Sequence, residues 1–281
     1  MRSIKKGDNV FELVTLPWGI KIKVRPRETI GRSIATMGVY DLSVTEVLWR
    51  LIDPREVAVD IGANIGYMTS IMAKRVGERG KVYSYEPHPE IYKELCENKS
   101  LWQETYGWHQ IEIQNLALST TSGVGTLNIP SHFRQNRGVA SLLDVVSGQS
   151  DSSDCQCPVA LARLDDLMND DCSIAVIKID VEGHELKVLQ GGANVIAHHA
   201  RDIIFEEHGG YPSKVTCYLE DHGFTVFRLY KELWGPHLEH AEGKSTGCLL
   251  PWEPPSYLAT KEPLRAIKRM KKRGWQALSN T

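Results

Sequence analysis

The chain has 281 residues, of which 42% are hydrophobic and 24% are charged, and its formal net charge is -2. This composition is typical of a globular protein and excludes a general attraction to nucleic acid or to anionic membranes. No apolar run approaches the roughly 20 residues that cross a bilayer, and the polar first residues lack a signal-peptide pattern. The sequence therefore predicts a cytoplasmic protein.

The first predicted elements form an extension of residues 1–56. Residues 10–24 alternate apolar and polar side chains around Pro17-Trp18-Gly19, which predicts a hairpin. A helix is predicted next from the apolar spacing between Val44 and Leu51, with Pro54 just beyond its end. We expect this extension to form a lid or a module packed beside the main domain.

A buried strand is then predicted at 57–61, followed by a glycine-rich turn from Gly62 to Gly66 and an amphipathic helix. About 20 positions after Gly66, a second strand ends in Glu86, whose carboxylate can accept hydrogen bonds from both hydroxyls of a ribose. This arrangement is typical of a nucleotide-cofactor site.

The turn has the pattern Gly-x-x-x-Gly and lacks the glycine that lets the backbone approach a pyrophosphate, which argues against NAD. Asp60 would repel a pyrophosphate but would pair with an ammonium group, directly or through water. S-adenosylmethionine has an ammonium group, a ribose and no phosphate. It is therefore the predicted cofactor, and a purely structural corner is the alternative.

Further strands are predicted at 82–86, 111–117, 174–180 and 203–207, alternating with helices, and a hairpin of 225–229 with 246–250 completes the sheet. We expect a doubly wound, mostly parallel sheet of seven strands in a domain spanning 57–258. The polar insertion between Leu118 and Leu164 should shape the substrate pocket.

Two groups of ionisable residues follow the strands at 174–180 and 203–207. The first contains Asp180, Glu182 and His184, and the second contains Glu206 and His208. Because carboxyl ends of parallel strands share one edge, the groups should converge on one rim. We take the histidines as candidate bases for a hydroxyl acceptor, with the acids orienting the acceptor or the histidine. The alternative is that His184 and its neighbours cap the following helix.

The motifs together resemble the FkbM family of S-adenosylmethionine-dependent methyltransferases. They comprise Val59 to Gly66, Glu86-Pro87, Leu164-Asp165-Asp166-Leu167 and Lys178-Ile179-Asp180-Val181-Glu182-Gly183. The resemblance covers roughly residues 10–250. It implies a Rossmann-like class I methyltransferase fold and O-methylation of a small-molecule hydroxyl, often on a secondary metabolite or a sugar.

The resemblance also implies roles for individual residues. Residues at the methionine side of the cofactor would be Asp60, Gly62, Asn64 and Gly66. Glu86 would bind the ribose, and Asp180 would lie beside the methyl group. Asn115, Ala117 and Leu118 would flank the adenine.

No metal is expected, because the six cysteines lack a Cys-x-x-Cys spacing. Cys155 and Cys157 could bind a soft metal, but their Ser- and Asp-rich surroundings favour a loop with free thiols. The sequence also allows the protein to form a homo-oligomer.

The tail at 259–281 contains seven cations between Lys261 and Arg273, which could follow phosphates. Together with Lys178, Asp180 and Glu206, the tail leaves an alternative open. The protein would then be an RNA ribose 2'-O-methyltransferase or an enzyme for a phosphate-rich or membrane-associated substrate. Apolar residues at helical spacing also allow a basic amphipathic helix that docks on the domain or lies on a membrane surface. We expect the tail to be dispensable for catalysis on a small acceptor.

Overall fold

The structure is a computed structural model that describes residues 10–131, 133, 136–138, 140–142, 155–169, 172–243 and 256–279. Its N-terminal extension begins with the predicted hairpin of β1 (Glu12–Thr15) and β2 (Lys21–Val24), which pair antiparallel. Helices α1 (Thr29–Met37) and α2 (Leu42–Leu51) follow and lead into the main domain.

An eight-stranded sheet forms the centre of the molecule, in the order β13-β12-β14-β11-β10-β3-β4-β5. Five of its strands are parallel: β3 (Val57–Ile61), β4 (Lys81–Tyr85), β5 (Ile111–Gln114), β10 (Ile174–Ile179) and β11 (Ala200–Glu206). The strand order reverses between β3 and β10, which is the topological switch point of a doubly wound sheet. The predicted Rossmann-like α/β fold is confirmed.

The antiparallel edge differs from the sequence prediction. Strand β12 (Thr225–Glu232) pairs with β13 (Gly235–His240), and β14 (Ser256–Thr260) inserts between β12 and β11. Among the described residues the sheet therefore has eight strands, where seven were expected. Residues 246–250, the predicted hairpin partner, lie outside the described residues. The sequence of β13, Gly-Pro-His-Leu-Glu-His, has too little apolar alternation to signal a strand.

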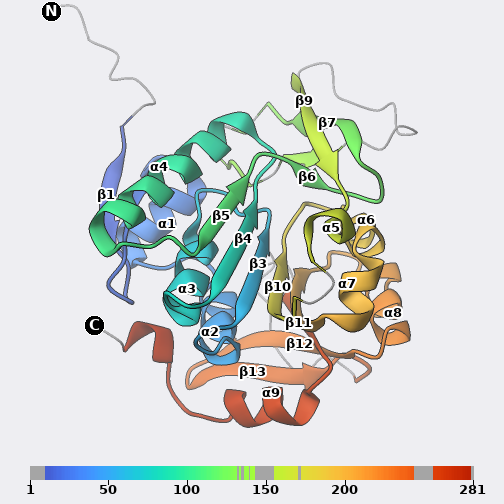
Figure 1. The fold of residues 1–281 in the computed structure, drawn as a ribbon. Helices are drawn as coiled ribbons and strands as arrows, with labels where there is room; N and C mark the ends of the chain where they lie inside the picture. The colour runs from blue at the N-terminus through green and yellow to red at the C-terminus, as the bar shows by residue number, and fades with distance from the viewer. Residues whose placement is uncertain are drawn as a thin grey trace, which may run out of the picture.

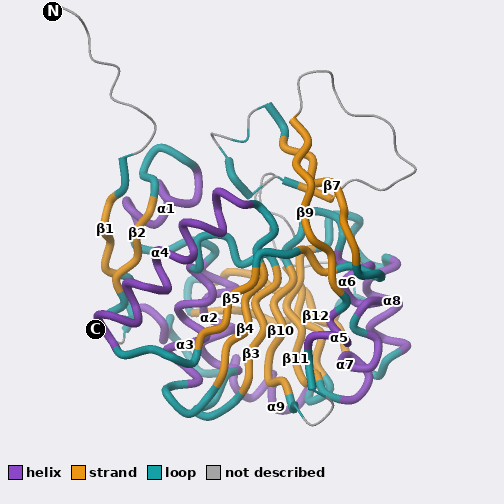
Figure 2. Tube along the Cα trace, turned by 45° about the horizontal axis from the view of Figure 1, so that its top comes forward, coloured by secondary structure: helices purple, strands orange, loops and turns teal. Residues whose placement is uncertain are grey.

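Helices cover both faces of the sheet, as Figures 1 and 2 show. One face carries α2, α3 (Tyr67–Val76), α4 (Pro89–Tyr106) and α9 (Pro263–Met270). The other carries α5 (Leu164–Leu167), α6 (Glu185–Gly191), α7 (Ala193–His198) and α8 (Lys214–Asp221). Successive strand residues such as Ala58 and Val59 enter opposite cores, because side chains alternate along a strand. No helix in these described segments is long and apolar enough to span a bilayer.

The insertion after β5 forms a second, small sheet in the order β6-β9-β7-β8, above the main sheet in Figure 1. Its strands are β6 (Ala117–Leu118), β7 (Gly123–Ile129), β8 (Ser141–Leu142) and β9 (Cys155–Ala162). The strand expected at 111–117 is thus divided between β5 and β6, and residues 115–116 turn the chain from one sheet to the other.

The C-terminal segment packs on the domain. The proposed boundary between 258 and 259 falls inside β14, and α9 contributes Ala266 to the core with no exposed surface. Arg269 donates hydrogen bonds to Asp53 and to the carbonyl of Arg50, and η1 (Gln276–Leu278) is held against α2. This packing favours the alternative in which the helix docks on the domain, and the dispensability of the tail for catalysis stays a prediction.

Candidate active site

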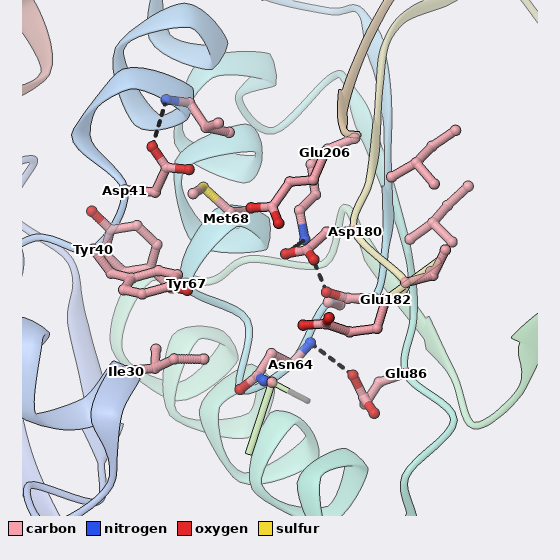
Figure 3. Close-up of a pocket in the computed structure, with 18 of the residues that line it drawn as sticks. Ile30, Tyr40, Asp41, Asn64, Tyr67, Met68, Glu86, Asp180, Glu182 and Glu206 are labelled. Atoms are coloured by element: carbon pink, nitrogen blue, oxygen red, sulfur yellow. Dashed lines mark hydrogen bonds and ion pairs between the residues drawn. The ribbon is translucent and has the colours of Figure 1, made fainter. Parts of the chain in front are cut away.

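A cavity of about 690 Å³ lies at the carboxyl ends of β3, β4, β10 and β11. This volume falls within the roughly 300–1,000 Å³ of small-molecule sites. Helices α1 and α2 of the N-terminal extension form one wall, and the second sheet contributes another. Figure 3 shows side chains from these separate elements converging on the cavity.

The two glycines of the turn after β3 are required by close packing. A Cβ atom at Gly62 would lie 1.9 Å from the carbonyl oxygen of Asp180, and φ at Gly62 is +75°. At Gly66, where φ is +92°, a Cβ atom would lie 2.6 Å from Leu95 and 2.8 Å from Trp102. The turn therefore fits tightly between the end of β10 and α4, and its backbone lines the cavity at Gly62, Ala63 and Asn64.

Glu86 directly follows β4 and is only 6% exposed. One carboxylate oxygen accepts the backbone N–H of Asn64 at 2.9 Å, and the other accepts that of His88 at 2.8 Å. Burial raises the pKa of Glu86 to about 7, although these two hydrogen bonds oppose the shift. Each oxygen keeps a second lone pair, so the group can accept two further hydrogen bonds.

Asp60 is fully buried and is not among the residues that line the cavity. It accepts a hydrogen bond from the Thr69 hydroxyl at 2.6 Å, and burial raises its pKa. Lys178 lines the cavity, with Nζ 3.6 Å from Asp60, 3.1 Å from Asp180 and 3.0 Å from the Gly62 carbonyl. The lysine thereby ties β3 to β10 and fixes the Asp180 carboxylate at the cavity wall.

Burial lowers the pKa of Lys178, but the charges of Asp180 and Asp60 outweigh burial and hold it above its ordinary value. Lys178 therefore stays charged, and its side chain is only 8% exposed. Its ammonium group is occupied by ion pairs with Asp60 and Asp180 and by a hydrogen bond to the Gly62 carbonyl.

A group of acids surrounds the other end of the cavity: Asp41, Asp180, Glu182 and Glu206 (Figure 3). Burial, followed by the charge of Asp180, raises the pKa of Glu182 to about 7 and that of Glu206 to about 9. Burial also raises the pKa of Asp41, which caps α2 by accepting the Val44 N–H at 3.1 Å. Glu182 has φ +52°, an uncommon backbone conformation for a residue with a side chain.

The two candidate histidines have different surroundings. His208 lines the cavity. His184 is 7% exposed, lies outside the cavity lining, and its Nε2 is 3.0 Å from the hydroxyl of Ser119. It occupies the N-cap position of α6, although its side chain makes no capping hydrogen bond.

The predicted adenine residues are also divided. Ala117 and Leu118 line the cavity together with Leu116. Asn115 is exposed and outside the lining, and its amide donates to the carbonyls of Glu86 and Pro87 at 2.8 and 2.9 Å. Asn115 thus fixes the backbone that follows Glu86.

The insertion contributes Arg137, a residue that no sequence pattern singled out. Arg137 is 7% exposed, lines the cavity and forms an ion pair with Glu94 through Nη1. Its Nη2 is buried and has no hydrogen-bond partner among the described residues. A buried, unsatisfied guanidinium N–H is a donor available to a bound ligand.

Other lining residues were missed because the sequence does not place them near the strand ends. Tyr40, Asp41 and Tyr67 reach the cavity through the packing of α2 and α3, and Lys231 reaches it from β12. Asp41 had a local signal, since an acid directly before a helix is a common N-cap. Within the residues that the structure describes, no group of three or more His, Cys, Asp or Glu side chains is arranged to hold a metal ion.

Comparison with known proteins shows which family the chain belongs to. The family model described as the methyltransferase FkbM domain matches residues 60–226, which is more than half of the 281-residue chain. The chain belongs to the FkbM methyltransferase family. It is therefore a methyltransferase, and the matched region begins near the end of β3 and contains Glu86, Asp180 and Glu206.

Two named relatives are similar to most of this FkbM chain. Methyltransferase sdnD of Sordaria araneosa is 28% identical over 206 residues, covering 63% of this chain and 76% of that protein. Hexuronic acid methyltransferase AglP of Haloferax volcanii is 26% identical over 211 residues, covering 73% and 77%. An FkbM methyltransferase structure from Methylobacillus flagellatus shares 14% identity with a TM-score of 0.44, over 83% of this chain and 56% of that one.

Proposed function

We propose that this protein is an S-adenosylmethionine-dependent O-methyltransferase that acts on a hydroxyl of a small molecule, such as a secondary metabolite or a sugar. The observation that carries the proposal is Glu86, whose two oxygens each retain a lone pair at the edge of the cavity. Two such acceptors match the two hydroxyls of a ribose.

The remaining residues also fit this cofactor. Ala117 and Leu118 offer an apolar surface for an adenine, and the backbone at Gly62 to Asn64 lies beside the cavity. Because Asp60 is fully buried, Asp180 is the better partner for the ammonium group, since its side chain is 33% exposed and lines the cavity. We assign Asp60 to holding Lys178 and Thr69.

The proposed chemistry uses the acids at the opposite end. When bound, the cofactor supplies an electrophilic methyl group. Glu182 removes the proton of the acceptor hydroxyl, because a pKa of about 7 is well matched to a general base at neutral pH. Glu206, with a pKa of about 9, stays protonated and donates a hydrogen bond that orients the acceptor oxygen. His208 lies at the exposed side of the cavity and can contact the acceptor.

The acceptor end is suited to a neutral polyhydroxylated or partly apolar molecule. Tyr40 and Tyr67 offer aromatic surfaces and hydroxyls beside the acids. The name of the relative AglP, a hexuronic acid methyltransferase, supports the sugar class of acceptor but not its neutrality, because a hexuronic acid carries a carboxylate. The RNA alternative draws no support from Lys178, because its ammonium group binds Asp60, Asp180 and the Gly62 carbonyl inside the protein.

Calorimetry tests the cofactor assignment. Titration with S-adenosylmethionine and with its demethylated product should each give binding of one molecule per chain, and NAD should give no heat of binding. Binding of NAD without binding of S-adenosylmethionine would refute the proposal.

A further inference from the structure

A surface outside the cavity combines an exposed apolar turn with a basic segment. The turn between β12 and β13 consists of Leu233, which is 81% exposed, and Trp234, which is 64% exposed. The basic segment is Lys271, Lys272 and Arg273, all exposed. We call this set of five residues the Trp234 surface.

The apolar residues are not explained by the hairpin. Two-residue hairpin turns favour Asn, Asp and Gly, and neither Leu nor Trp assists such a turn. The backbone freedom needed here is supplied by Gly235, which has φ +131°. Exposing two large apolar side chains at a turn therefore indicates a contact with another apolar phase.

The turn and the basic segment are held together. The backbone N–H of Gly274 donates to the carbonyl of Trp234 at 2.8 Å, so Arg273 directly adjoins the turn. In Figure 1 the connection from α9 to the C-terminus runs past the turn between β12 and β13. The five side chains thus share one surface although 37 or more positions separate the turn from the basic segment in the sequence.

Arg50 fixes the orientation of the basic segment. Its guanidinium group donates to the carbonyls of Met270, Lys272 and Gly274. Arg50 itself is anchored by an ion pair with Glu46, at 2.6 Å. Because these carbonyls point inward to Arg50, the side chains of residues 271–273 project outward as a preformed group of positive charges.

We propose that the Trp234 surface docks on an anionic lipid bilayer. Tryptophan and leucine insert at the level of the headgroups, and neighbouring lysines and arginines attract anionic lipids. Charge complementarity favours this occupant over a neutral surface. Glu232 contributes one negative charge nearby but is 3.8 Å from His237, and three cations outweigh it.

Docking there would bring the cavity close to the lipid headgroups. Lys231 lines the cavity, and the exposed turn begins two residues later along β12. At about 3.3 Å per strand residue, Trp234 lies roughly 10 Å along the chain from Lys231. The inference goes beyond the proposed function and stands or falls independently of the cofactor and of the chemistry.

Vesicle sedimentation with the full chain tests the proposal. Wild-type protein should bind vesicles of phosphatidylcholine with phosphatidylserine, bind vesicles of phosphatidylcholine alone much less, and be released by high salt. The variant Lys271→Gln/Lys272→Gln/Arg273→Gln should lose about 100-fold in binding, because each neutralised cation should cost about fivefold. Leu233→Ser/Trp234→Ser should also release the protein from the vesicles.

Matched controls separate this surface from general effects. Val124→Ser removes an apolar side chain that is 78% exposed on β7, and Lys74→Gln/Arg79→Gln removes exposed charges near α3. Both controls should bind vesicles like the wild type. The proposal is overturned if the wild type does not prefer anionic vesicles, or if the surface variants bind as well as the controls. Binding to single-stranded RNA that depends on residues 271–273, without vesicle binding, would also overturn it.

Discussion

Replacing Glu86 by Ala should weaken cofactor binding by a predictable amount. The carboxylate has one free lone pair on each oxygen, and a hydrogen bond to a charged group contributes about 1.5–3 kcal/mol. Loss of one such bond corresponds to a dissociation constant raised by roughly 10- to 150-fold. Calorimetry with S-adenosylmethionine measures the change.

The ionisation of Glu86 also predicts how much the affinity for the cofactor changes with pH. A pKa of about 7 for Glu86 in the unliganded protein means that the carboxylate is scarce at pH 6 and dominant at pH 8. If only the carboxylate accepts the ribose hydroxyls, wild-type affinity should rise by about tenfold over this range from Glu86 alone. Glu86→Ala should lose that part of the increase.

A neighbouring acid provides the control. Glu90 is exposed in the first turn of α4, so Glu90→Ala should bind the cofactor like the wild type. Melting curves show whether Glu86→Ala remains folded, because Glu86 also accepts the N–H groups of Asn64 and His88. A folded Glu86→Ala protein with an unchanged dissociation constant would refute the assignment of Glu86 to the ribose.

Three further variants and a truncation test other parts of the site and fold. Glu182→Gln should lower kcat by roughly 100-fold with little change in cofactor affinity, and a loss below threefold would exclude Glu182 as the base. Glu206 has a pKa of about 9, above the value of 4.5 for an unshifted group, so its contribution to stability is full below pH 4.5 and is lost progressively as pH rises from 4.5 to 9. Glu206→Gln should therefore melt at a higher temperature than the wild type at pH 8 but not at pH 4; equal melting at both would contradict the buried-charge argument. Gly62→Ala should lower the melting temperature and abolish cofactor binding, because the new Cβ atom would lie 1.9 Å from the carbonyl oxygen of Asp180. Normal cofactor binding by this variant would show that the turn can move aside. Truncation before Lys261 should reduce helix content and melting temperature, measured by circular dichroism, because it removes α9 and the partners of Arg50. An unaltered melting curve would show that this segment does not stabilise the fold.

The parallel part of the fold was readable from the sequence because its signals are local. The buried strands Val57–Ile61 and Ile174–Ile179 are short apolar runs, and each is followed by a turn and a helix. The antiparallel edge was not readable in the same way. Strand β13 contains Gly, Pro and two His, and its place in the sheet depends on pairing with β12.

The site was predictable where its residues follow the ends of strands. Glu86, Asp180 and Glu206 all line the cavity, because carboxyl ends of parallel strands share one edge. His184 follows a strand end as well, but the backbone turn at Glu182 and Gly183 carries it to the Ser119 side. The left-handed conformation of Glu182 gave no signal in the sequence.

Residues brought in by tertiary packing were outside the reach of sequence patterns. Tyr40 and Asp41 precede a predicted helix, but only the packing of α2 on α3 brings them to the cavity. Arg137 depends on an ion pair with Glu94, which is 43 positions away. Such contacts depend on how the helices and sheets pack against one another. The periodicity of apolar residues in the sequence carries no information about this packing.

The most direct test of the central claim is transfer of an isotope-labelled methyl group. Purified protein is incubated with labelled S-adenosylmethionine and with the small-molecule, RNA and protein fractions of a cell extract, and the products are analysed by mass spectrometry. Label should enter a small molecule as an ether that survives mild base, because the acceptor is a hydroxyl, and Glu182→Gln should reduce the transfer. Label confined to RNA or protein would contradict the account, and a methyl ester cleaved by mild base would show that the acceptor is a carboxylate.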